Sequence, residues 1–288
     1  MNRPALFVIG APRSGNTLTR RVLMASGQIY IPPETYVVGE LVEAWPRWRR
    51  LDWREKAWLF TSYFERHPHF ADFEVESLGP LAGEIEALGK DERNLRACFD
   101  RFYAFMARAH GFTQARWGDK TPWNTVHLAA IMKAFPDAQF LYLSRHGLDA
   151  VASQIKADMR DLDASARRWV EANAACLRAQ RKAPGRVMQV SYETLVRNPE
   201  NVFRQVFDWA GLAFDSDYLT RVPGRLGDVG RLGHHAAVTQ AITPDSIGRW
   251  RETLKSADLA ALDRGFWDMM GRLGYACEPS RAMAGDTG

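Results

Sequence analysis

An apolar run that leads into a glycine-rich turn constrains the fold of this chain more than any other feature. Residues 5–10 read ALFVIG, and residues 10–17 read GAPRSGNT. A short apolar run closed by glycine is typical of a strand buried on both faces of a parallel sheet. The pattern then predicts a helix from Thr17 to about Ser26, so this stretch reads as a strand, a tight turn and a helix.

Strands and helices alternate along the rest of the chain. Apolar runs predict two more buried strands, at 139–144 and 186–191, and a short strand at 115–118. Helices are predicted at about 124–135, from Gly147, and at 162–182, 199–211 and 256–272. This alternation predicts an α/β fold of three layers, in which helices flank a central parallel sheet and ligands bind at the carboxyl ends of the strands.

A helical insertion is predicted at about 39–112. It follows an extended segment at 28–37, where two consecutive prolines exclude a helix. We expect a single domain over 1–276 and a disordered polar tail over 277–288. Loops are expected near 67–72, 78–83 and 221–248.

Composition bounds the class of protein. With 288 residues, 46% of them hydrophobic, the chain can bury a full core. Its formal net charge is +4, but basic and acidic residues are interspersed, which indicates a mixed solvated surface and no nucleic-acid partner. No run approaches the roughly 18 apolar residues of a membrane span, and signal-peptide features are lacking, so we expect a cytoplasmic protein. Cys98, Cys176 and Cys277 do not fit a disulfide framework or a metal cluster.

The turn at 10–17 is suited to bind an anion. Its backbone N–H groups and the N-terminus of the following helix point at one spot and carry partial positive charge. Its two glycines allow a tight curve, while Arg13 adds a cation and Ser14 and Thr17 add hydroxyl donors. The alternative is an ordinary strand-to-helix turn that happens to contain glycines.

The same turn nearly matches the phosphate-binding loop GxxxxGK[ST]. Asn16 stands where a nucleoside-triphosphate loop carries the lysine that reaches the β- and γ-phosphates. Thr17 supplies the hydroxyl that such a loop needs, but the cation lies three residues upstream of Asn16, at Arg13. The loop can hold a phosphate yet is poorly suited to a magnesium-bound triphosphate, which disfavours a small-molecule kinase.

A second phosphate site is predicted at the end of the strand at 139–144. Arg145 follows this strand, and Ser153 lies eight residues later, about two turns into the next helix. Together they can clamp a phosphate, although an arginine paired with a nearby acid and a solvated serine are the alternative. Two phosphate sites at neighbouring strand ends indicate a ligand with two phosphate groups.

Five stretches of the chain resemble the sulfotransferases that use 3′-phosphoadenosine 5′-phosphosulfate (PAPS). They are PRSGNT at 12–17, WGDKTPWN at 117–124, LSRHGLDAVAS at 143–153, VSYETLVRNPENVF at 190–203 and IGRWRETL at 247–254. The match covers about residues 4–275 in the right order. The resemblance implies a P-loop-type fold and the transfer of a sulfuryl group from PAPS to an acceptor, with no metal.

The resemblance also implies roles for individual residues. Arg13 corresponds to the basic residue that stabilises the leaving phosphate, as a fixed charge, because arginine keeps its proton. Asn16 departs from the more usual threonine but still offers a side-chain donor and a backbone N–H. The loop that holds the 5′-phosphate comprises Arg13, Ser14, Gly15, Asn16 and Thr17.

Four more positions are assigned to the donor in the same way. Arg145 and Ser153 resemble the clamp on the 3′-phosphate, and Tyr192 resembles the tyrosine that lies against the adenine. Arg249, in IGRW, resembles the late basic residue that closes over the cofactor.

The acceptor hydroxyl needs a base, and Glu34 in the sequence PPET is our candidate. It resembles the glutamate of protein-tyrosine sulfotransferases and of some bacterial ones. The alternative is a Glu34 that only caps a helix or forms a salt bridge, for example with Arg20. Lys120, in GDKTP, is predicted to contact the transferring sulfonate, the alternative being a surface lysine or an ion pair with Asp119.

The sequence does not identify the acceptor. It leaves open a lipid or polyketide alcohol, a sugar, a phenol or a peptide tyrosine, and it does not decide between hydroxyl and amine. The aromatic residues at 36–75 fit core packing first, then an acceptor pocket or an interface for a homodimer or a membrane surface. His234 and His235 are interpreted as solvated loop residues in the first place, and contact with the acceptor is the alternative. A catalytically silent nucleotide-binding module is the third hypothesis, after the transferase and the kinase.

Overall fold

The structure is a computed structural model, and it describes residues 4–113, 116–222 and 241–275. A five-stranded parallel sheet forms its centre, in the order β2-β3-β1-β4-β5. The strands are β1 Leu6–Gly10, β2 Ile29–Tyr30, β3 Arg116–Lys120, β4 Gln139–Ser144 and β5 Val187–Ser191. The predicted parallel sheet flanked by helices is confirmed, and all five residues of β1 are buried.

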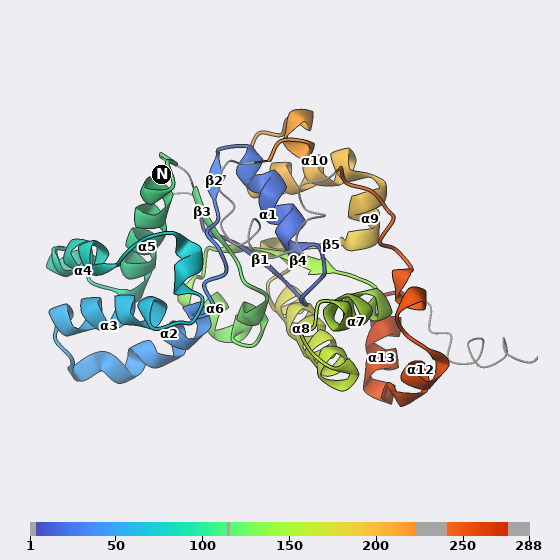
Figure 1. Cartoon of the computed structure of the whole chain (residues 1–288). Coiled ribbons are helices and arrows are strands. Elements are labelled where there is room, and N and C mark those ends of the chain that lie inside the picture. Colours follow the sequence, from blue (N-terminus) through green and yellow to red (C-terminus); the bar gives the residue numbers. More distant parts are fainter. Residues whose placement is uncertain (1–3, 114–115, 223–240, 276–288) are drawn as a thin grey trace, which may run out of the picture.

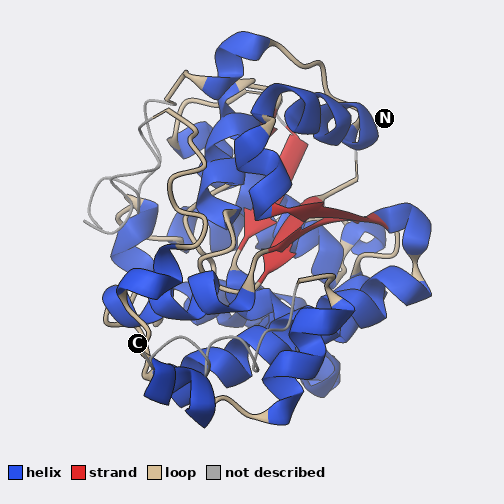
Figure 2. Ribbon diagram, turned by 90° about the vertical axis from the view of Figure 1, so that its right-hand side faces the viewer, coloured by secondary structure: helices blue, strands red, loops and turns tan. Residues whose placement is uncertain are grey.

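Helices cover both faces of the sheet (Figures 1 and 2). One face carries α1 Asn16–Ala25 and α10 Pro199–Ala210, while the other carries α6 Leu128–Ala134, α7 Gly147–Lys156 and α8 Leu162–Lys182. The strand order explains this arrangement. The connection from β1 runs toward the β2 edge, whereas those from β3 and β4 run toward β5, so right-handed crossovers place their helices on opposite faces.

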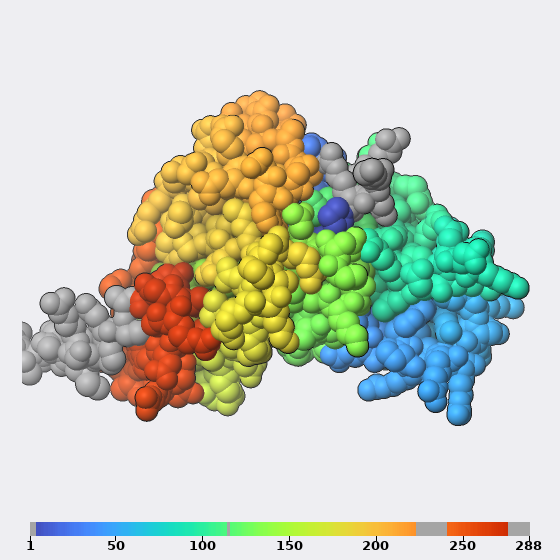
Figure 3. Space-filling model, turned by 180° about the vertical axis from the view of Figure 1, so that it is seen from behind, coloured from blue at the N-terminus to red at the C-terminus, as the bar shows by residue number. Residues whose placement is uncertain are grey.

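The helical insertion lies beside the β2 edge of the sheet, and Figure 3 shows it at the opposite end of the molecule from the C-terminal helices. It contains α2 Val38–Ala44, α3 Trp53–Glu65, α4 Gly79–Glu86 and α5 Leu95–Ala109. Asp52 starts α3 with a capping box, because it accepts from Glu55 N and Glu55 reaches back to Asp52 N. The loop predicted at 78–83 is wrong, since α4 covers most of it.

Other helix boundaries differ from the prediction for local reasons. The helix predicted at 124–135 begins only at Leu128, after a 3₁₀ turn at Pro122–Thr125. The helix predicted at 256–272 is divided into α12 Ser256–Ala261 and α13 Arg264–Arg272, because Asp263 caps a new helix at Phe266 N. A short helix, α9 Tyr192–Arg197, was not predicted, and its N-cap is Ser191.

Some predictions lie outside the described residues. They concern His234, His235, most of the loop at 221–248 and the tail at 277–288. Within the part of the chain that the structure describes, no helix combines the length and apolar character needed to span a bilayer.

Candidate active site

The turn after β1 is shaped by three residues with positive φ. At Gly10 (φ 148°), a Cβ atom would lie 2.3 Å from the carbonyl oxygen of Leu143, so only glycine lets β1 and β4 approach this closely. Arg13 (φ 65°) and Gly15 (φ 91°) then turn the chain into α1. Gly15 is the N-cap and provides no side-chain hydrogen bond, so the first N–H groups of α1 are left for an anion.

Asn16 and Ser14 serve the loop itself. The Asn16 Nδ2 atom donates to the carbonyl oxygen of Ala11 at 2.9 Å inside the protein. Asn16, which occupies the position of the lysine in a triphosphate loop, therefore stabilises the turn through this hydrogen bond. The Ser14 hydroxyl is buried and has no hydrogen-bond partner among the described residues.

A cavity of about 750 Å³ opens at the carboxyl ends of the strands. The structure brings most of the predicted site together at this cavity, from five separate segments of the chain. The predicted residues that line it are Arg13, Gly15, Asn16, Thr17, Glu34, Arg145, Ser153, Tyr192 and Arg249. Two predicted residues, Ser14 and Lys120, are not part of the lining.

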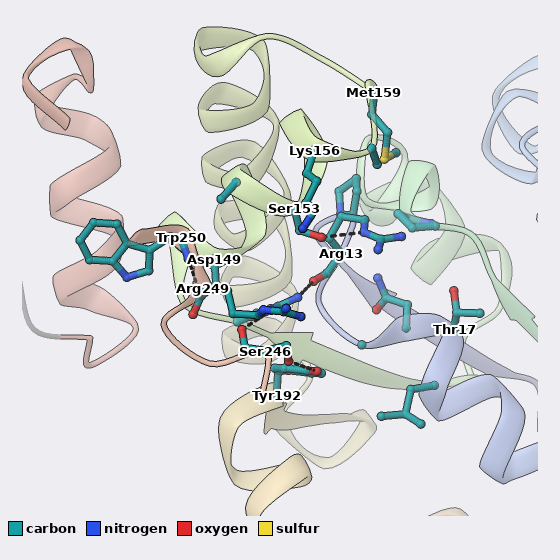
Figure 4. Close-up of a pocket in the computed structure, with 18 of the residues that line it drawn as sticks. Arg13, Thr17, Asp149, Ser153, Lys156, Met159, Tyr192, Ser246, Arg249 and Trp250 are labelled. Carbon is teal, nitrogen blue, oxygen red and sulfur yellow. Dashed lines mark hydrogen bonds between the residues drawn. The ribbon is translucent and has the colours of Figure 1, made fainter. Parts of the chain in front are cut away.

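The two predicted phosphate sites contact each other directly (Figure 4). The Arg13 Nε atom donates to Ser153 Oγ at 3.0 Å, and Arg145 Nη1 donates to the carbonyl oxygen of Arg13 at 2.8 Å. Burial lowers the pKa of Arg13, and the charge of Arg145 lowers it further. A half-buried and a buried cation held this close favour a bound anion.

Tyr192 lies against the turn and against Arg145. A Cβ atom at Gly15 would be 2.7 Å from Tyr192 Cδ2, so the ring needs glycine there. The Arg145 guanidinium lies 4.3 Å from the ring centroid, and the Tyr192 hydroxyl is 2.6 Å from Ser246 Oγ. Tyr192 therefore links the turn after β1 to the segment around Ser246.

Asp149, which sequence reasoning missed, anchors that segment. Its buried carboxylate accepts hydrogen bonds from the backbone N–H groups of Gly248, at 2.8 Å, and Trp250, at 3.0 Å. Arg249 lies between these two residues, lines the cavity and is about half exposed, with its Nε 3.6 Å from Glu252. The sequence places Asp149 near Arg145 but gives no sign of a partner a hundred residues away.

Glu34 reaches the cavity from the loop after β2 and forms an ion pair with Lys120. The Lys120 Nζ atom lies 2.6 Å from Glu34 Oε1, and the Lys120 side chain is fully buried. The predicted alternative of a salt bridge at Glu34 is therefore present, with Lys120 as a partner. Lys120 lies at the cavity only through Glu34, since it does not line the wall itself.

A buried carboxylate next to Lys120 fixes the Glu34 loop. Asp119 accepts from the hydroxyls of Thr35 and Tyr103, both at 2.8 Å, and from Asn124 Nδ2 at 2.6 Å. Full burial raises the pKa of Asp119, while these hydrogen bonds oppose the shift. Because Thr35 follows Glu34 directly, this network sets where the Glu34 carboxylate points.

The far side of the cavity is built from residues that the sequence did not single out. The insertion and its preceding loop contribute Tyr36, whose ring stacks on His69 at 4.9 Å between centroids. Tryptophans of the insertion such as Trp45 and Trp48 pack on each other instead, 5.4 Å apart, and are not in the lining. The remaining lining on this side includes Asp72, Trp123, Met159, Arg160 and Arg168.

Comparisons with known proteins agree with this geometry. A family model described as "Sulfotransferase family" matches residues 4–216. Protein-tyrosine sulfotransferase A of Caenorhabditis elegans is 23% identical over 283 residues, which cover 94% of this chain and 67% of that protein. An uncharacterized protein of Aquifex aeolicus is 23% identical over 278 residues, covering 91% of this chain, and the chain spans only 32% of its length.

A solved structure shares the fold. The sulfotransferase domain from the olefin synthase of Synechococcus PCC 7002 aligns with a TM-score of 0.63 at 23% identity. The alignment covers 96% of this chain and 97% of that one, so the sheet, its flanking helices and the insertion all fall within it.

Proposed function

This chain belongs to the sulfotransferase family, and we propose that it transfers the sulfuryl group of PAPS to a hydroxyl acceptor in the cavity. The observation that carries the proposal is the convergence of three groups. Arg13, which is half-buried, and Arg145, which is buried, supply positive charge at the N-terminus of α1, and Glu34 faces the same space from the loop after β2. A donor with two phosphates and an acceptor that must lose a proton need this combination.

Donor binding follows from the local geometry. We assign the 5′-phosphosulfate to the uncapped N-terminus of α1 beside Arg13, and the 3′-phosphate to Arg145 and Ser153. Tyr192 is assigned to the adenine, and Arg249 to the closing side of the site. The hydrogen bond from Arg13 to Ser153 would be replaced by bonds to the donor, so the protein holds these side chains near their working positions beforehand.

The reaction is an in-line displacement at sulfur. The acceptor oxygen forms a bond to sulfur while the bond from sulfur to the phosphate oxygen breaks, and Glu34 takes the hydroxyl proton. Charge that builds on the leaving phosphate is stabilised by Arg13 and by the N–H groups of the turn. Once Glu34 has become neutral, the Lys120 ammonium no longer faces the charge of that carboxylate and can attract the sulfonate oxygens.

A kinase is the less favoured function. The Asn16 side chain donates into the turn at Ala11 and carries no charge, so the β- and γ-phosphates of a triphosphate would lack the lysine that normally neutralises them. Arg13 and Arg145 lie where two separate phosphates can bind, which suits the donor of a sulfotransferase.

Calorimetry with two nucleotides tests the proposal. We expect 3′-phosphoadenosine 5′-phosphate (PAP) to bind without magnesium, and ATP with magnesium to bind far more weakly. The same protein should then transfer sulfate from PAPS to at least one compound of a hydroxyl panel. Binding of ATP alone would overturn the proposal in favour of a kinase, and tight PAP binding without any transfer would favour a silent module.

A further inference from the structure

The wall of the cavity contains an arginine that is fixed to the fold through two hydrogen bonds. Arg168, on α8, is only 6% exposed. Its Nη2 atom donates to the carbonyl oxygen of Pro122 at 2.6 Å and to Thr125 Oγ1 at 2.5 Å. These bonds attach the guanidinium to the 3₁₀ turn that follows Lys120 and Thr121.

The rest of this guanidinium has no hydrogen-bond partner in the part of the chain that the structure describes. The Nε and Nη1 atoms of Arg168 are buried and make no hydrogen bond to any described residue. No carboxylate of the described residues lies within 4.0 Å of the Arg168 side chain either. A buried cation without a counter-charge is costly, and an anionic ligand that binds beside it removes that cost.

A second arginine adds to the positive character of this wall, because Arg160 also lines the cavity. Burial lowers the pKa of Arg168 and the charge of Arg160 lowers it further, while Glu171 acts in the opposite direction. The side chain stays protonated, because arginine does so in proteins. Arg168 therefore carries a positive charge at the cavity, where it can attract an anion.

Apolar surface lies next to the cations. The guanidinium carbon of Arg168 is 5.6 Å from the centroid of the Trp123 ring. Trp123 is 39% exposed and Met159 is 40% exposed, although both line the cavity. A ligand that pairs an apolar body with one anionic group matches this wall.

The donor does not account for these residues. Its two phosphates are already assigned to Arg13, Arg145 and Ser153. Arg168 instead contacts Pro122, two residues after Lys120, and Lys120 is the ion-pair partner of Glu34. The unpaired charge is thus attached to the same strand end as the base that the acceptor must reach.

We propose that Arg168, assisted by Arg160, forms an oxyanion subsite for the acceptor, so that the acceptor is a hydroxyl compound that also carries a carboxylate. The carboxylate would bind at Arg168, the apolar body would lie along Trp123 and Met159, and the hydroxyl would face Glu34. This inference rests on the proposed function, since it presumes that the acceptor occupies this end of the cavity.

Matched pairs of ligands test the subsite on the PAP-loaded protein. Suitable probes are 4-hydroxyphenylacetate and 3-hydroxydecanoate, each beside its neutral methyl ester, titrated by calorimetry. We expect at least one acid to bind about tenfold or more tightly than its ester, as a charge-assisted hydrogen bond allows. Sulfate transfer from PAPS should show the same preference as a lower KM for the acid.

Three variants locate the source of the preference. Arg168→Gln should reduce the ratio between acid and ester to below about threefold, with ester and PAP affinities unchanged, and Arg168→Lys should keep part of it. Arg160→Gln, at a half-buried position, should reduce the ratio less than Arg168→Gln does. It still tests the subsite if Arg168→Gln fails to fold. Arg167→Gln is the control, because Arg167 lies on the same helix, 62% exposed and paired with Asp163.

The outcomes separate the subsite from the proposed function. Equal or absent binding of acid and ester in every pair, or a preference that survives in both Arg168→Gln and Arg160→Gln, overturns the oxyanion subsite. Failure of the unmodified protein to bind PAP instead overturns the sulfotransferase mechanism. Binding of PAP together with transfer to neutral acceptors only would retain the mechanism and reject the subsite.

Discussion

The arginines of the donor end, Arg13 and Arg145, contact each other, whereas the arginine of the acceptor end, Arg168, is hydrogen-bonded to the backbone of a neighbouring turn. At the donor end, Arg13 contacts Ser153 and Arg145 contacts both the Arg13 backbone and the Tyr192 ring. At the acceptor end, Arg168 is attached to Pro122 through one nitrogen, and its two other nitrogens make no hydrogen bond to a described residue. Glu34 also belongs to the acceptor end, where it pairs with Lys120.

The two ends differ in the hydrogen bonds that a ligand must break before it can bind. A nucleotide donor must exchange existing hydrogen bonds between side chains for bonds to its phosphates, so the donor end is already organised for a fixed ligand shape. An acceptor gains contacts to Arg168 that no described group supplies, so its charge decides how well it binds. We infer that the donor end sets the reaction and the acceptor end sets the choice of substrate.

Removing the proposed base, Glu34, should have the largest effect on turnover, since transfer from donor to acceptor requires the loss of the acceptor proton. Glu34→Gln is expected to lower kcat by about 10²- to 10⁴-fold, the usual contribution of a general base, with the affinity for PAP unchanged. Steady-state kinetics and PAP calorimetry measure this. Because Lys120 is buried and would lose its partner, thermal melting should accompany the assay.

The exposed Glu40, 3.9 Å from Arg66, provides the control for this change. Glu40→Gln should leave both kcat and the melting temperature unaltered. Normal turnover by Glu34→Gln would remove Glu34 from the base role and leave only its ion pair.

Loss of the donor-end cation should have the next largest effect. Arg13→Met is expected to lower kcat by about 10²- to 10³-fold, because charge on the leaving phosphate loses its nearest cation. PAP affinity should also fall about tenfold, as for a lost charged hydrogen bond. Arg197→Met, at an exposed position on α9, is the matched control. A change in PAP affinity with kcat intact would assign Arg13 to binding alone.

The donor end was largely predictable because its residues lie in contiguous motifs. Gly10 ends a buried strand, Arg13 and Gly15 lie in the turn after it, and Arg145 directly follows another strand. In a parallel sheet, such positions meet at one edge whatever the details of packing. Local spacing therefore sufficed to place them together.

The acceptor end was not predictable, because its contacts join segments with no local relation. The ion pair of Glu34 with Lys120 depends on the pairing of β2 with β3 and on the Asp119 network, which no spacing reveals. The partners of Arg168 are a backbone carbonyl and a threonine hydroxyl 43–46 residues away. In sequence, Arg168 is one more arginine of the RRW stretch on a long helix, and only burial distinguishes it from Arg167.

A methyl group at Gly15 should test the packing of the donor end at a smaller scale. Gly15→Ala would place Cβ 2.7 Å from Tyr192 Cδ2 at a backbone φ of 91°. We expect PAP affinity to fall about tenfold and stability to fall by about 1 kcal/mol, the usual cost of a positive φ without glycine. Calorimetry and thermal melting measure both. Gly83→Ala, in α4 with open space around it, is the control and should not weaken PAP binding.

The smallest effect on PAP affinity is expected at Asp149, which supports the donor end but has no assigned contact with the donor. Asp149→Asn keeps the shape but offers only one accepting oxygen to the N–H groups of Gly248 and Trp250. Losing one such bond should destabilise the protein by about 1–2 kcal/mol and loosen the segment that carries Arg249, which weakens donor binding. Removing a negative charge near two phosphates acts in the opposite direction, so the net loss of PAP affinity should be only about threefold.

A salt series separates these two contributions, because screening reduces the charge effect and leaves the loosened segment unchanged. The affinity gap between Asp149→Asn and the unmodified protein should widen as ionic strength rises, while the difference in melting temperature stays constant. Tighter PAP binding by Asp149→Asn with an unchanged melting temperature would mean that repulsion outweighs anchoring. The segment at 244–253 would then be held chiefly by Ser246, through Tyr192 and Arg145, and the donor end would need no acidic support.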